Sequence, residues 1–189
     1  MSEITINTIE DACRALVQGN KCYVNAQKKG NISQIIKSQI PEEGQKPYAV
    51  VVTCSDSRVP AEYIFSAGIG ELFVIRTAGH VIGDFELGSI EYGVKYLGAK
   101  VVCVLGHNHC GAVKAAMGNH GKGYVQKILN EIIPVITGEK DVEKCEKLNI
   151  ENSVSRIMES DMIKNLTAEG YVKIISGKYD IETGIVEFY

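Results

Sequence analysis

The stretch "YAVVVTCSDSR" (48–58) joins an unbroken apolar run to a thiol, a carboxylate and a guanidinium. Two further runs rich in β-branched residues follow, "ELFVIRT" (71–77) and "AKVVCVLGH" (99–107). Unbroken runs of this kind are typical of strands buried on both faces, as in a parallel sheet covered by helices. Residues 84–98 carry apolar side chains at helical spacing and are long enough for a crossover helix. The sequence therefore predicts an α/β fold with a mostly parallel central sheet flanked by helices.

Helices are also expected before and after these strands. Residues 8–28 begin with a possible capping box and carry apolar residues at helical spacing, which predicts a first helix. A short helix is predicted at 33–39, and the clearest of the later helical segments is 148–166. The last residues, 170–189, form two strand-like pieces around a glycine-containing turn, which predicts an antiparallel edge hairpin.

The composition argues against several classes of protein. The 189 residues are 45% hydrophobic and 23% charged with a formal net charge of −3, which is ordinary for a soluble globular protein. We expect a single domain over 1–189 with an N-terminal helical arm. No basic cluster is interleaved with aromatic residues, which argues against a nucleic-acid partner. No stretch approaches the roughly 18 apolar residues of a membrane span, and no apolar signal core follows the first residue, so we expect a cytoplasmic protein without a membrane partner.

The cysteines point to metal chemistry or catalysis. Six cysteines in a chain of this length are too sparse for a disulfide scaffold, and a reducing compartment would keep them as thiols. Four of them are expected to be small buried hydrophobic residues: Cys13, Cys22, Cys103 and Cys145. The other two, Cys54 and Cys110, lie in motifs that carry further reactive groups.

Two short motifs follow predicted strands, where open parallel sheets usually bind their ligands. Cys54, Asp56 and Arg58 stand at alternate positions, so an extended backbone would project all three to one side. Taken alone, this pentapeptide is equally compatible with a buried cysteine, a capping aspartate and a surface arginine. In "GHNHCGAV" (106–113), the spacing of His107 and Cys110 lets both side chains meet one metal ion.

Together the two motifs predict a zinc site made by Cys54, His107 and Cys110. Three protein ligands leave the fourth tetrahedral position open, which is the catalytic arrangement. A structural site with a fourth ligand remains an alternative, as do unrelated buried thiols without a metal. His109 is expected to point away from the site between its neighbours.

The pair "CSDSR" (54–58) and "GHNHCGA" (106–112) resembles the β-class carbonic anhydrases, whose signature is CxDxR followed by HxxC. The resemblance is firmest over 44–117. It implies one Zn²⁺ per chain on the three predicted ligands. It also implies reversible hydration of carbon dioxide to bicarbonate and a proton by attack of zinc-bound hydroxide, with Asp56 and Arg58 as the catalytic dyad.

The chemistry of these residue types agrees with that resemblance. Zinc can lower the pKa of bound water from 15.7 to about 7. Asp56 can accept a hydrogen bond from the resulting hydroxide, and Arg58 can hold Asp56 by a bidentate, charge-assisted pair. If that pair broke, Asp56 could bind the zinc and expel the water, and the family is known for both an open and a closed state.

The plant-type subgroup of this family implies further pocket residues, contributed across a dimer interface. Gln45 would donate a hydrogen bond to a substrate oxygen, while Phe73 and Tyr92 would keep the pocket apolar. Gly111 would let the substrate approach the backbone closely. The structural alternatives are a turn residue, two core aromatics and a glycine at a helix start. A shared pocket implies a homodimer or a homotetramer.

Some features leave alternatives open. The stretch "RTAGH" (76–80) departs from the commonest family pattern. His80, His109 and His120 are possible proton carriers, although a surface or capping role is expected for each. The same zinc site would also suit a carbonyl sulfide or carbon disulfide hydrolase. A non-catalytic zinc or bicarbonate-binding module would not need the dyad.

Overall fold

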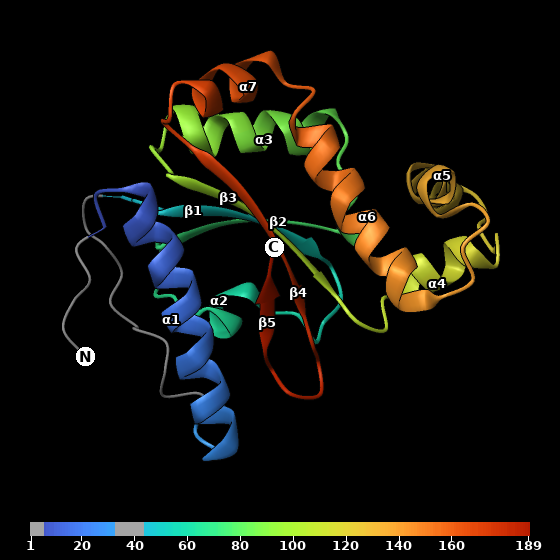
Figure 1. Cartoon of the computed structure of the whole chain (residues 1–189), viewed down its shortest axis with the longest axis horizontal. Coiled ribbons are helices and arrows are strands. Elements are labelled where there is room, and N and C mark those ends of the chain that lie inside the picture. Colours follow the sequence, from blue (N-terminus) through green and yellow to red (C-terminus); the bar gives the residue numbers. More distant parts are fainter. Residues whose placement is uncertain (1–5, 33–43) are drawn as a thin grey trace.

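A computed structural model describes residues 6–32 and 44–189. Five strands form one sheet in the order β2-β1-β3-β4-β5 (Figure 1). Their bounds are β1 Ala49–Cys54, β2 Leu72–Thr77, β3 Val101–His107, β4 Lys173–Tyr179 and β5 Val186–Phe188. All neighbouring strands are parallel except β4 and β5, which are antiparallel. The predicted mostly parallel sheet with an antiparallel C-terminal edge strand is confirmed.

Helices cover both faces of this sheet (Figure 1). On one face lie α1 (Ile9–Lys28) and α2 (Ala61–Ile64), and on the other lie α3 (Asp84–Lys95), α6 (Val142–Ile157) and α7 (Asp161–Ala168). Beyond the carboxyl end of β3 come α4 (Gly111–Met117) and α5 (Tyr124–Ile136), and a one-turn helix, η2 (Ala78–His80), follows β2. The helix predicted at 33–39 lies outside the described residues.

The side chains of β1 and β3 alternate between the two faces. Val51 and Leu105 pack against α1 and α2, whereas Val52 and Val104 pack against α3, α6 and α7. Every residue of both strands is buried. This burial on two sides explains why the sequence shows unbroken apolar runs instead of alternation.

The first helix begins as the sequence predicts and is tied to the C-terminal hairpin. The amide of Asp11 donates to Thr8 Oγ1 at 3.1 Å, and the amide of Thr8 donates to Asp11 Oδ2 at 3.1 Å. Further along the helix, Asn20 Nδ2 donates to the carbonyl of Gly184 at 2.9 Å, and Asn20 Oδ1 accepts from the amide of Val186 at 2.9 Å. These buried bonds fix α1 beside the turn between β4 and β5.

Two local predictions differ from the structure. The segment 148–166 is not one helix, because α6 ends at Ile157 and α7 starts after Ser160, whose Oγ accepts a hydrogen bond from the amide of Ile163. Both helices cover the same face of the sheet, so the apolar pattern continues across the break and hides it. Cys103 and Cys145 are fully buried, as predicted, whereas Cys13 and Cys22 are only partly buried.

None of the described helices is long and apolar enough to cross a membrane.

The strand order creates a natural site at the carboxyl edge of the sheet. From β1 the chain moves outward to β2 and then returns to place β3 on the other side of β1. In open parallel sheets, a reversal of this kind opens a crevice at the carboxyl ends of the two central strands, where ligands bind. The residues at these two ends are Cys54 and His107.

Candidate metal centre

The carboxyl ends of β1 and β3 bring three potential metal ligands together. Cys54 ends β1, His107 ends β3 and Cys110 immediately precedes α4. Their ligand atoms all lie within 4.8 Å of one another, and all three residues are buried. Within 6–32 and 44–189, no other set of three or more His, Cys, Asp and Glu side chains comes together in this way. The structure thus brings together the three residues that the sequence predicts as zinc ligands.

His107 is oriented so that a metal ion could bind its Nε2 atom. Its Nδ1 lies 2.7 Å from the carbonyl oxygen of Asn108, and because that oxygen can only accept, Nδ1 carries the proton. Nε2 is buried and has no hydrogen-bond partner. A buried nitrogen without a partner is costly, and ligating histidines typically hold their other nitrogen in just such a bond. Two thiolates and one imidazole are a donor set that suits zinc.

The surroundings of Cys54 stabilise its thiolate, the form that binds metals. The neighbouring Cys110 thiol has the largest influence and lowers the pKa of Cys54, burial opposes it, and the nearby His107 side chain lowers the pKa further. The amides of Asp56 and Gly79 also donate to Cys54 Sγ, at 3.4 and 3.3 Å. Together these groups hold the pKa of Cys54 well below its usual range. The pKa of Cys110 is raised in turn, because its thiol shares its proton with the Cys54 thiolate, because it is buried, and because Cys54 is charged.

Asp56 and Arg58 form the bidentate pair that the sequence predicts. Arg58 Nε donates to Asp56 Oδ1 at 3.0 Å, and Arg58 Nη2 donates to Asp56 Oδ2 at 2.8 Å. The backbone amide of Arg58 adds a third bond to Oδ1 at 2.9 Å. The Arg58 side chain is the main cause that lowers the pKa of Asp56 to about 2. Asp56 is therefore ionised and turned toward Arg58, and it is not part of the three-ligand cluster.

Arg76, which the sequence did not single out, fixes the backbone of the same loop. Its Nε donates to the carbonyl of Cys54 at 3.2 Å, and its Nη2 donates to the carbonyl of Asp56 at 2.6 Å. Arg76 stands opposite Thr53 on the neighbouring strand β2. The pairing of β1 with β2 is needed to see this role, because 20 residues separate Arg76 from Asp56.

The predicted pocket residues Gln45, Phe73 and Tyr92 do not reach this centre within one chain. Phe73 lies on β2 four residues before Thr77, the partner of Cys54, which corresponds to about 13 Å along a strand. Its ring packs against Tyr92 with 6.1 Å between centroids. Gln45 is exposed in the segment that leads into the amino end of β1. All three lie toward the amino edge of the sheet, whereas the metal ligands lie at the carboxyl edge.

Gly111 is exposed at the first turn of α4, directly after Cys110. A Cβ atom added there would meet no other atom within 4 Å. Packing inside the chain therefore does not require glycine at this position. The chain itself leaves the space beside Gly111 open.

The histidines outside the cluster differ from one another. His80 is 2% exposed and its Nδ1 lies 2.9 Å from Ser153 Oγ, so the expected surface or capping role is wrong for this residue. The turn of η2 points its ring into the core, and burial lowers its pKa to about 4. His109 is exposed and pairs with Glu182 at 3.0 Å, outside the cluster as predicted. His120 is exposed.

A cluster of potential metal ligands at the carboxyl edge of a parallel sheet is the kind of site that a zinc enzyme would use. A family model described as carbonic anhydrase matches residues 49–186. The matched region contains all three clustered ligands and the Asp56–Arg58 pair.

Individual relatives show to which class of carbonic anhydrase the chain is similar. The chain is 38% identical over 184 residues to carbonic anhydrase 2 of Mycobacterium tuberculosis, covering 92% of this chain and 89% of that one. Its fold resembles the β-carbonic anhydrase CafA of Aspergillus fumigatus (TM-score 0.73, 23% identity, 94% and 89% covered). It also resembles a β-carbonic anhydrase of Sordaria macrospora described as tetrameric (TM-score 0.71, 24% identity, 90% and 93% covered). The chain belongs to the β-class carbonic anhydrases, which are lyases.

Replacement of Arg58 by methionine should raise the pKa of Asp56 from about 2 toward the ordinary value of about 3.9. The carboxylate pKa is depressed in the parent protein, so Asp56 should stay ionised throughout a titration from pH 6 to pH 3, whereas in Arg58→Met it should take up its proton within that range. The carboxyl ¹³C shift of Asp56 measures this directly. Arg14→Met, which removes the arginine paired with Asp11 on α1, is the control and should leave Asp56 unchanged. If Asp56 gave the same titration curve in the parent and in Arg58→Met, Arg58 would not be the cause of its low pKa.

Proposed function

We propose that this protein is a zinc enzyme that reversibly hydrates carbon dioxide to bicarbonate and a proton. One zinc ion per chain would be held by Cys54, His107 and Cys110. The observation that carries this proposal is the buried Nε2 of His107, which has no hydrogen-bond partner and lies beside two cysteines. When bound there, zinc would lower the pKa of water far below its free value of about 15.7 and so supply a hydroxide nucleophile.

The Asp56–Arg58 pair would orient this nucleophile. The carboxylate of Asp56 stays ionised because Arg58 lowers its pKa, so it can accept a hydrogen bond and never donates one near neutral pH. The two bonds from the Arg58 side chain also hold both carboxylate oxygens away from the ligand cluster. Arg58 thereby keeps the fourth coordination position accessible to substrate. We propose Asp56 as the orienting catalytic residue and Arg58 as its restraint.

We propose that a second copy of the chain completes the pocket. Gln45, Phe73 and Tyr92 lie toward the edge of the sheet opposite the metal ligands of their own chain, so they can line a substrate pocket only across an interface. A row of aromatic side chains along α3 is exposed beside the edge strand β2, with Phe85 at 89% and Tyr96 at 72%. Burial of such a row between subunits is favourable. The assembly would be a homodimer or, like the relative from Sordaria macrospora, a homotetramer.

We also propose a cytoplasmic location. The two cysteine ligands, Cys54 and Cys110, are in the thiol form, and a reducing compartment would keep them available for a metal ion.

Substitutions can distinguish the role of the metal ligands from the role of the Asp56–Arg58 pair. The parent should contain one zinc per chain by atomic absorption. Cys54→Ser should lose both zinc and carbon dioxide hydration, because it removes a ligand, whereas Cys13→Ser on α1 should keep both. Asp56→Asn should keep its zinc and lose turnover on the order of 100-fold, because the nucleophile is no longer oriented. Full turnover in Asp56→Asn would remove Asp56 from the mechanism.

Stopped-flow hydration of carbon dioxide by the zinc-loaded protein, followed across pH, tests the reaction itself. The same preparation is assayed for sulfide release from carbonyl sulfide and from carbon disulfide. Hydration should be the fast reaction and should increase as pH rises, because the nucleophile is the deprotonated form of water. Rapid sulfide release without hydration would favour the hydrolase alternative.

The shared pocket predicts that assembly and activity are linked. Tyr96→Glu places a charge in the exposed row of α3 and should lower both the sedimentation coefficient and the hydration rate. Tyr124→Glu is the matched control, because Tyr124 is 83% exposed on α5 and should leave both unchanged. A parent that sediments as a fully active monomer would exclude a pocket built from two chains.

A further inference from the structure

Helix α6 carries three buried polar residues on the side that faces the candidate metal centre. Glu146, Asn149 and Ser153 are 3%, 0% and 2% exposed, and their spacing places them on one face of the helix. The helix approaches β3 so closely that a Cβ atom at Gly106 would lie 2.4 Å from Ile150. Polar side chains on such a face cost free energy unless they have partners. Their partners are the backbone of Cys110, the turn η2 that faces Cys54, and Lys178 on β4.

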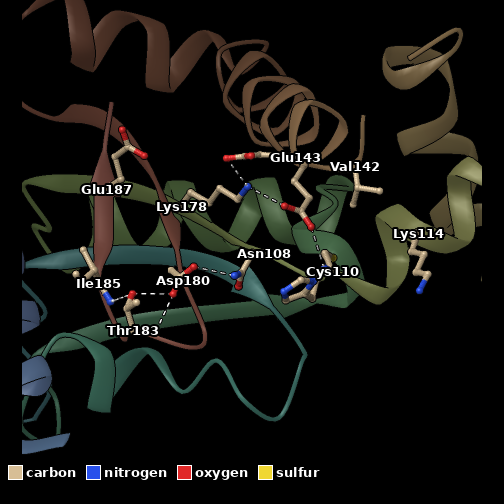
Figure 2. A pocket seen from close by; sticks show the side chains of 12 residues that line it. Asn108, Cys110, Lys114, Val142, Glu143, Lys178, Asp180, Thr183, Ile185 and Glu187 are labelled. Carbon is tan, nitrogen blue, oxygen red and sulfur yellow. Dashed lines mark hydrogen bonds and ion pairs between the residues drawn. The ribbon is translucent and has the colours of Figure 1, made fainter. Parts of the chain in front are cut away.

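Glu146 holds the backbone of Cys110. Its Oε1 accepts a hydrogen bond from the Cys110 amide at 3.3 Å, and its Oε2 pairs with Lys178 Nζ at 2.8 Å. Lys178 extends from β4 along a pocket of about 730 Å³ toward α6, where Glu143 lies on its other side (Figure 2). The Lys178 side chain is only 12% exposed. The carboxylate of Glu146 is therefore fixed between a buried cation and the residue that precedes α4.

Asn149 and Ser153 hold the turn that faces Cys54. Asn149 Nδ2 donates to the carbonyl of Gly79 at 2.9 Å, and Ser153 Oγ donates to the carbonyl of His80 at 3.0 Å. The amide of Gly79 in turn donates to Cys54 Sγ at 3.3 Å. Gly79 has a φ of 66° and a Cβ there would press on α4 at 2.9 Å, so this turn depends on glycine and on its two anchors.

We propose that Glu146 and Asn149 are positioning residues for the metal, through which one helix fixes both cysteine ligands. Glu146 sets the position of the Cys110 backbone, and Asn149 sets the amide that donates to Cys54 Sγ. This proposal rests on the proposed zinc site and adds to it residues that do not touch the metal. Outer partners of metal ligands typically change metal affinity by 10- to 100-fold when they are removed.

The first test compares two glutamates of α6 that both pair with Lys178. Glu146→Ala should weaken zinc binding by about 10- to 100-fold in competition with a chelator. Glu146→Gln should recover part of this loss, because its amide oxygen can still accept from the Cys110 amide. Glu143→Ala is the matched control, since Glu143 lies 3.7 Å from Lys178 Nζ and is 84% exposed, and it should bind zinc like the parent.

The second test uses cobalt-loaded protein, whose visible absorption reports ligand geometry. Asn149→Leu, which is close to asparagine in shape, should shift this spectrum and weaken zinc binding. Asn152→Leu on the same helix loses a bond to the carbonyl of Glu131 and should leave both unchanged. Thermal unfolding of each variant shows which ones fold, and if Asn149→Leu does not, the glutamate series decides.

Each outcome has a separate meaning. A parent that binds no zinc would refute the proposed metal site itself. The positioning role alone would be overturned if the parent bound zinc and Glu146→Ala behaved like Glu143→Ala. The two variants would then bind zinc equally tightly and give the same cobalt spectrum.

Discussion

The parallel pairing of β1 with β3 is the constraint on which the site depends. Neither strand carries a complete set of ligands, and 52 residues separate the paired positions Thr53 and Leu105. Their register places the end of β1 beside the end of β3, so Cys54 and His107 face the same crevice. The short connection from His107 to α4 then returns Cys110 to this point. The apolar runs that bury both faces of the sheet thus also fix the geometry of the ligands.

Cys54 and Asp56, the two negative groups at this edge of the sheet, are stabilised by different partners. The amides of Asp56 and Gly79 donate to Cys54 Sγ and favour its thiolate, while Arg58 donates two side-chain hydrogen bonds to Asp56. These two negative groups are only two residues apart, and each has its own positive or donor environment. In this arrangement both carboxylate oxygens of Asp56 are bonded to Arg58, and Asp56 lies outside the ligand cluster. The family resemblance implies an open and a closed state, and this arrangement is consistent with the open one.

The sequence predicts much of this because the decisive signals are local. The apolar runs, the capping box at Thr8 and the two motifs each lie within a few residues, so periodicity and spacing reveal them. Other features depend on which elements pack together, and no single stretch of sequence contains that information. These features are the break at Ser160, the contact of Arg76 with the Asp56 loop and the burial of His80. The role proposed for Gln45, Phe73 and Tyr92 would need a second chain, so it is the least accessible from one sequence.

The polar residues of α6 leave a signal in the sequence. Glu146, Asn149 and Ser153 interrupt the apolar side of a helix whose neighbouring residues Ile150 and Ile157 are fully buried. A polar residue at a core position conflicts with the local pattern, and such conflicts tend to mark functional sites because their cost must be offset elsewhere. Here the offset is complete for Glu146, which finds both a cation and an amide, and for Ser153, which bonds the turn at His80. Asn149 leaves its Oδ1 without a partner, so stability alone does not explain asparagine at this position, whereas a role in holding Gly79 against Cys54 does.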